Sequence, residues 1–201
     1  MTPSGAANLA DLATGSAPAG SPFVLVAIVA AFALLPFALI LLTSFVKISV
    51  VLSIARSAIG AQQIPPSPVI TGLALGLTAH VMTPVVTDVG ARCAPILASA
   101  RGGVEPSNPL ETGARLVEAG RPPIADFLTA HARPRDRALF ARLAHRARST
   151  RADAPPVRDD DLMVLAPAFL VSELGEAFEI GFVIFVPFLV IDMVVANILL
   201  A

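Results

Sequence analysis

The run LAPAFLVSELGEAFEIGFVIFVPFLVIDMVVANILLA, residues 165–201, decides the fold. From Ile180 onward it is apolar except for Pro187, Asp192 and Asn197. About 20 such residues are enough for a helix to cross the hydrocarbon core of a bilayer. In a water-soluble domain, a helix that is apolar on all sides needs far more surrounding protein than 201 residues supply. The run therefore predicts a membrane protein.

The same run carries four carboxylates, which a simple membrane anchor does not need. Glu173, Glu176 and Glu179 span about 120° of a helix face, so they can look into one interface together, although one cation cannot pair with all three. A solvated face is the alternative interpretation. Asp192 lies inside the apolar run, where an unpaired carboxylate costs about 2.5 kcal/mol or more on insertion. We therefore expect Asp192 to have a partner or to be protonated.

Composition supports a membrane class. Hydrophobic residues make up 55% of the chain and charged residues 14%, against about 25% charged residues in ordinary globular domains. Trp and Tyr are absent, so the chain lacks the aromatic belt that usually marks the two membrane interfaces. This absence indicates that protein, rather than lipid, surrounds much of the apolar surface.

The first apolar arm follows a lead of 21 residues that is rich in Ala, Gly, Ser and Pro and is expected to be disordered. Residues 23–42 contain no charge and predict a first membrane span, kinked at Pro36. A cleaved signal peptide fits poorly, because no Lys or Arg precedes the run and the run exceeds the usual core of about 7–15 residues. Residues 43–60 are expected to continue the same helix, with Ser49, Ser53 and Ser57 on one face as a seam for close helix packing.

A second arm is expected at residues 69–89, after a turn at residues 61–68 whose prolines prevent a helix. Gly72 and Gly76 form a GxxxG spacing on this arm and predict helix packing. Lys47 and Arg56 both precede this turn, and they leave two alternatives. They lie at a membrane boundary and extend toward water, or at least one of them pairs with a carboxylate on a neighbouring helix.

The middle of the chain is hydrophilic. Residues 92–161 hold 12 of the 14 basic residues and nine of the 15 acidic ones. Apolar residues at helical spacing predict two amphipathic helices, one over Ile124, Phe127 and Leu128 and one after Pro134 with Leu139, Phe140 and Leu143. Nucleic-acid binding is rejected, because acidic residues interleave with the arginines and stacking aromatics are nearly absent. Residues 151–161 are expected to be a loop.

These segments predict an all-α fold of membrane-associated helical hairpins with a small helical domain outside the membrane. The expected parts are a lead at 1–21, a first apolar hairpin at 22–90, a hydrophilic domain at 91–161 and a second apolar segment at 162–201. The net positive middle domain favours a cytoplasmic location, but long loops escape the charge rule, so charge alone leaves the orientation open.

The sequence contains no phosphate loop, zinc-ligand pair or nucleophile elbow. We therefore expect no enzyme activity, no cofactor and no metal. One function that the residues allow is a small ion-coupled transporter or channel, with Glu173, Glu176, Glu179 and Asp192 as carriers.

Two blocks carry a resemblance that points to another function. They are TSFVKISVVLSIARSAIGAQQIPPSPVITGLALGLTAHVMTPV, residues 43–85, and the run at 165–201. Both resemble the signature regions of the FliP/YscR family, core membrane subunits of the type III secretion and flagellar export apparatus. The segments FVKISVV, QQIPP and FEIGF are more similar to the secretion branch of the family than to the flagellar branch.

The resemblance implies a bacterial inner-membrane subunit that builds a gated export pore for unfolded proteins, together with other copies of itself and companion subunits. It implies that the domain at 91–161 faces the periplasm. Lys47, Arg56, Glu173, Glu176, Glu179 and Asp192 are then candidate intersubunit or pore-facing residues. Family members continue with a methionine-rich segment and another apolar helix, so we expect the chain to be truncated after Ala201.

Overall fold

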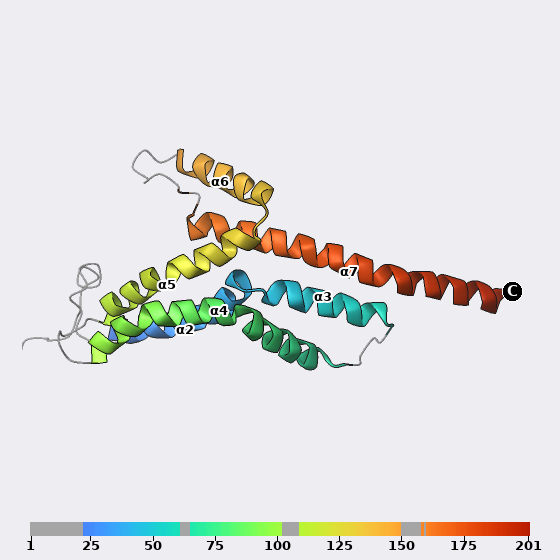
Figure 1. Ribbon diagram of the computed structural model, residues 1–201, viewed down its shortest axis with the longest axis horizontal. Helices are drawn as coiled ribbons and strands as arrows, with labels where there is room; N and C mark the ends of the chain where they lie inside the picture. The colour runs from blue at the N-terminus through green and yellow to red at the C-terminus, as the bar shows by residue number, and fades with distance from the viewer. Residues whose placement is uncertain (1–21, 61–64, 102–108, 150–157, 159) are drawn as a thin grey trace, which may run out of the picture. The chain divides into compact units, whose positions relative to one another are not determined.

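The computed structural model describes residues 22–60, 65–101, 109–149, 158 and 160–201. All regular secondary structure in these ranges is α-helical, so the predicted all-α class is confirmed (Figure 1). The helices are α2 (Pro22–Leu42), α3 (Phe45–Ala58), α4 (Ser67–Arg101), α5 (Pro109–His131), α6 (Pro134–Ser149) and α7 (Leu162–Leu200). The lead predicted at residues 1–21 and most of the loop predicted at residues 151–161 lie outside the described residues.

The expectation that residues 43–60 continue the first helix is wrong, because they form a separate helix, α3. Helix α2 runs through Pro36, and the chain bends by 81° between the segments Pro36–Leu42 and Phe45–Ala58. Thr43 lies at this break, where its hydroxyl donates to the carbonyl of Leu39 and accepts a hydrogen bond from the amide of Phe45 at 3.4 Å. Such local side-chain hydrogen bonds offer the backbone an alternative to the regular helix.

Helix α4 contains the predicted second arm and is longer than the apolar pattern indicates. It continues through Pro84 and Pro95 to Arg101, past the point where the sequence becomes hydrophilic. Its buried residues recur at every fourth position, and they are Ile70, Ala74, Thr78 and Met82. This spacing places the four residues along a single face.

The chain divides into two compact units. The first comprises Met1–Ala38 and Pro84–Ile124, and the second comprises Leu39–Thr83 and Ala125–Ala201. Helices α3, α6 and α7 belong wholly to the second unit. Within that unit α3 and α6 both pack on α7, as Figure 1 shows.

Helix α7 has two different halves. Asp161 caps its N-terminus, and the Asp161 carboxylate accepts a hydrogen bond from the amide of Met163 at 3.4 Å. The 39 residues of the helix extend for about 58 Å. All its buried residues lie between Val164 and Gly181. Beyond Gly181 its side chains are exposed or half-exposed in the single chain. This half of the helix requires cover from lipid or from another protein.

Two of the described helices, α4 and α7, are long and apolar enough to cross a membrane. A third span results if the bent pair formed by the end of α2 and by α3 is counted as one. The predicted membrane-associated helical architecture is therefore supported by length and composition.

Helix α3 lies close to α7 at Gly181. A Cβ atom added there would overlap the side chain of Ile54 and lie 3.2 Å from its Cβ atom. Beside this crossing lies an open groove of about 320 Å³, lined by Ser49, Val50, Ser53, Ile54, Ser57 and Phe185. The predicted serine seam thus borders the α3–α7 packing, and each serine hydroxyl donates to a carbonyl of its own helix.

Helix α6 is attached to the first half of α7 near both of its ends. Near its start Asp136 accepts a hydrogen bond from Ser172, and near its end Arg148 forms an ion pair with Asp161 at 3.7 Å.

The two predicted amphipathic helices are present as parts of α5 and α6. Phe127 and Leu128 are buried as expected, and the ring of Phe127 packs on Phe169 with centroids 5.6 Å apart.

Two apolar residues of α6 are not buried. Leu139 is 43% exposed and Leu143 is 47% exposed. Hydrogen bonding of Asp136 to α7 turns the Asp136 side of the helix inward. The expected apolar face of α6 is therefore left open in the single chain.

Candidate functional site

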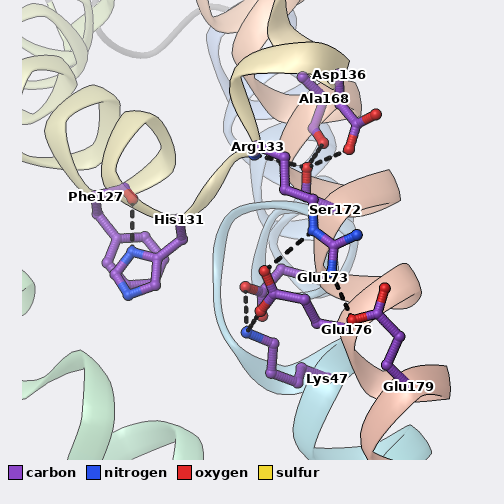
Figure 2. A network of polar contacts seen from close by, with 10 residues as sticks. All are labelled: Lys47, Phe127, His131, Arg133, Asp136, Ala168, Ser172, Glu173, Glu176 and Glu179. Atoms are coloured by element: carbon purple, nitrogen blue, oxygen red, sulfur yellow. Dashed lines mark hydrogen bonds and ion pairs between the residues drawn. The ribbon is translucent and has the colours of Figure 1, made fainter.

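A cluster of charged side chains joins α3 and α7. Lys47 reaches from α3 to two carboxylates on successive turns of α7, with Nζ 2.7 Å from Glu173 Oε1 and 2.7 Å from Glu176 Oε2 (Figure 2). The side chain of Lys47 is 23% exposed, and that of Glu173 only 2%. Lys47 therefore pairs with carboxylates on a neighbouring helix of its own chain. This is the second of the two alternatives that the sequence leaves open for Lys47 and Arg56.

A second cation extends the cluster. Arg133 lies between α5 and α6, and its Nε atom is 3.4 Å from Glu176 Oε1 while its Nη2 atom is 2.9 Å from Glu179 Oε2. The hydrogen bond to Glu179 raises the pKa of the Arg133 guanidinium above its usual value. Arg133 therefore stays charged at physiological pH. Figure 2 shows the resulting order along α7, with Glu176 shared between the two cations. We call Lys47, Arg133 and the three glutamates the charge cluster.

Ser172 fastens the start of α6 to the same stretch of α7. Its hydroxyl oxygen accepts a hydrogen bond from the backbone amide of Arg133 at 2.9 Å. Its proton has two acceptors within reach, Asp136 Oδ2 at 2.7 Å and the carbonyl of Ala168 at 2.9 Å. Ser172 is 1% exposed and Asp136 7%, so these bonds are shielded from water. Hydrogen bonds to a charged, buried group are among the stronger ones in proteins.

Glu173 is the most deeply buried of the three glutamates in the charge cluster. It is 1% exposed, and among the described residues its Oε2 atom has no hydrogen-bond donor. Lys47 lies 2.7 Å from the other oxygen, but not at an angle typical of a hydrogen bond. The burial of this carboxylate therefore depends on the charge of Lys47, because burying an unpaired charge costs far more than burying a paired one.

The remaining predicted residues lie elsewhere. Arg56 donates to the carbonyl of Pro65 at 3.3 Å and to Ser67 Oγ at 3.2 Å, and so connects the end of α3 to the start of α4. Asp192 stands on the exposed second half of α7. Gly72 and Gly76 are exposed, and a Cβ atom added to either would meet nothing within 4 Å in this chain. Packing at these glycines stays a prediction about contacts with other chains.

Sequence reasoning missed Arg133, Ser172 and Asp136. One signal pointed to Arg133, because three glutamates over 120° of a helix need more than one cation. Ser172 directly precedes Glu173 and resembles any small residue in an apolar helix, while Asp136 resembles any acidic residue in a helix's first turn. Only the packing of α6 on α7 distinguishes them.

The charge cluster and Ser172 hold α3 and α6 in position on α7. No group of three or more His, Cys, Asp or Glu side chains suited to a metal ion converges among the residues that the structure describes. The paired charges connect α3, α7 and the junction between α5 and α6, with sequence separations of up to 129 residues. Such an arrangement fixes how α3 and α6 are oriented on α7.

Comparison with known proteins gives the family. The model of the FliP family matches residues 28–201. The chain is 42% identical over 177 residues to the hypersensitivity response secretion protein HrcR of Ralstonia nicotianae, covering 88% of this chain and 79% of that protein. It is 38% identical to the Yop proteins translocation protein R of Yersinia pestis, over 88% and 78% of the two chains. It is 40% identical to the flagellar biosynthetic protein FliP of Caulobacter vibrioides, over 95% and 66%. The chain belongs to the FliP family.

Proposed function

We propose that this chain is a structural membrane subunit of a bacterial type III protein export apparatus. The names of its relatives describe secretion, translocation and flagellar biosynthesis. In this role the chain contributes helices to a pore through the inner membrane, through which unfolded proteins leave the cytoplasm. It has no catalytic role, and energy is supplied by other parts of the apparatus.

The observation that carries this proposal is the division of α7. Its first half is fastened to α3 and α6 by the charge cluster and by Ser172, whereas its second half is uncovered in the single chain. The second half also carries Asp192 and Asn197, polar groups that are costly against acyl chains. Other subunits would cover these groups and the apolar side chains together, as in an assembled pore.

The ion-coupled transporter is not supported by any of these findings. Glu173, Glu176 and Glu179 are each within 3 Å of a cation of the same chain. A carboxylate held by a fixed cation is a poor ion carrier, because a transported ion must displace that partner. Of the four carboxylates considered, Asp192 is the one without an ion pair among the described residues.

The test is purification of the tagged chain from its native membrane in mild detergent, followed by mass measurement of the intact complex. We expect several copies of the chain together with companion membrane subunits. The variant Asp192→Asn tests the rival, because it preserves size and removes the charge. A chain that purifies as a solitary monomer or simple dimer, and whose ion flux is lost in Asp192→Asn, would contradict the proposal.

A further inference from the structure

The exposed side of α6 is both basic and apolar. Arg135, Leu139, Arg142 and Leu143 follow one another at spacings of four, three and one, so they share one face of the helix. Arg135 is 94% exposed, and Leu139 and Leu143 are nearly half exposed. Asp136, the acidic residue of α6, is buried against Ser172 and so is withdrawn from this face. We call these four residues the basic face of α6.

Helix α5 carries a face of opposite charge within the first unit. Glu111, Ala114 and Glu118 lie at spacings of three and four and are all exposed. Glu118 has no ion pair among the described residues. Glu111 pairs with Arg115 at 2.6 Å, but both side chains are about 60% exposed, so this helical pair is weak and easily exchanged. We call Glu111, Ala114 and Glu118 the acidic face of α5.

The two faces match in spacing. Arg135 and Arg142 are seven residues apart, as are Glu111 and Glu118, so each pair of charges is separated by about 10.5 Å along its helix. In an antiparallel pairing Arg135 meets Glu118, Arg142 meets Glu111, and Leu139 falls on Ala114. A parallel pairing would place Leu139 on Arg115 instead. The antiparallel register therefore pairs opposite charges around a leucine that packs on a small residue.

We propose that the basic face of α6 docks on the acidic face of α5 of a second copy of this chain. The contact joins two different surfaces, and such head-to-tail contacts close into rings when the rotation between copies permits. It would bury Leu139 and Leu143, which the chain leaves open. The inference rests on the proposed multi-copy export subunit and assigns which surfaces of the hydrophilic domain meet.

Cross-linking between differently tagged copies tests the contact. The background is Cys93→Ser, because Cys93 is the single cysteine. One copy carries Ala114→Cys and the other Leu139→Cys, both in the full chain expressed with its apparatus. We expect a disulfide between the two tags on mild oxidation. The matched control replaces Ala114→Cys by Thr112→Cys, which is half-exposed on α5 and lies about 160° around the helix from Ala114.

Charge reversal provides the second readout. Glu118→Arg alone and Arg135→Glu alone should each lower the cross-linking yield about fivefold, because an exposed attractive pair becomes a repulsive one. Combining Glu118→Arg on one copy with Arg135→Glu on the other should restore it. An unchanged melting temperature of each single variant shows that the loss is not unfolding.

The outcomes separate this inference from the proposed function. If the chain purifies in several copies but the Ala114→Cys and Leu139→Cys copies cross-link no better than the control, the contact is wrong and the function stands. If Leu139→Cys cross-links instead to a protein of different mass, the partner is a companion subunit and the second-copy assignment is overturned. If the chain purifies as one copy per complex, both proposals fail.

Discussion

At the scale of single residues, the buried carboxylate of Glu173 requires a positive charge beside it. It is buried in the first half of α7, and the charge of Lys47 is the compensation that the described chain provides. A buried pair of this kind is weak evidence for stability, because well-packed apolar residues often serve as well. Its contribution is specificity, since only one register of α3 on α7 brings Lys47 to both carboxylates.

Replacing Lys47 by methionine should destabilise the protein by about 3 kcal/mol, which lowers the melting temperature by about 6–12 °C. The physical reason is the uncompensated buried charge of Glu173. The double variant Lys47→Met with Glu173→Met should recover most of the loss. Thermal unfolding of the purified protein in detergent measures both.

The control for this experiment is Arg115→Ala, which removes an exposed helical pair and should change stability by no more than about 0.5 kcal/mol. If Lys47→Met melts at the same temperature as Arg115→Ala, then Glu173 does not depend on Lys47.

At the scale of elements, α7 serves two purposes along one helix. Its first half is a packing platform with small residues at the closest approaches, and its second half is a surface for cover from outside the chain. Gly181 marks the boundary between them. A side chain there would overlap Ile54, so the glycine allows α3 to lie close enough for Lys47 to reach its carboxylates.

Gly181→Ala should therefore destabilise the α3–α7 contact by about 1–3 kcal/mol through overpacking, partly offset by the higher helix propensity of alanine. The matched control is Gly175→Ala on the same helix, where the added Cβ atom lies 3.8 Å from Arg133 Nη1, an ordinary contact. Gly175→Ala should be neutral or stabilising by up to about 1 kcal/mol. Melting temperatures that move in the same direction for both variants would contradict the close approach at Gly181.

At the scale of the whole molecule, the side of the membrane on which the hydrophilic domain lies determines which subunits it can contact. The proposed export role places residues 91–161 in the periplasm, against the net positive charge of that segment. The basic face of α6 would then be available to other subunits outside the bilayer.

Topology is measured with a membrane-impermeant maleimide on Ser149→Cys in the Cys93→Ser background. Ser149 is exposed at the end of α6. We expect full labelling in spheroplasts, with no increase after lysis. Labelling that requires lysis would place the domain in the cytoplasm and refute the proposed orientation.

The sequence by itself determined the membrane class, the helical fold and the family. These properties follow from runs of apolar residues, helical spacing and long motifs, which are local in the chain. The serine seam of α3 and the amphipathic helices in α5 and α6 were predictable for the same reason. The sequence also offered, as one of two alternatives, that Lys47 or Arg56 pairs with a carboxylate on a neighbouring helix, but it did not say which one.

Only the tertiary structure decided which cations meet which carboxylates, that the chain bends sharply at Thr43, and that Leu139 and Leu143 stay exposed. The bend coincides with hydrogen bonds of the Thr43 side chain, which a period of apolar residues does not encode. Ser172 lies more than 30 residues along the chain from both Arg133 and Asp136. Their pairing depends on which side of α6 faces α7, and burial of Asp136 against Ser172 outweighs the apolar stripe that the sequence offers.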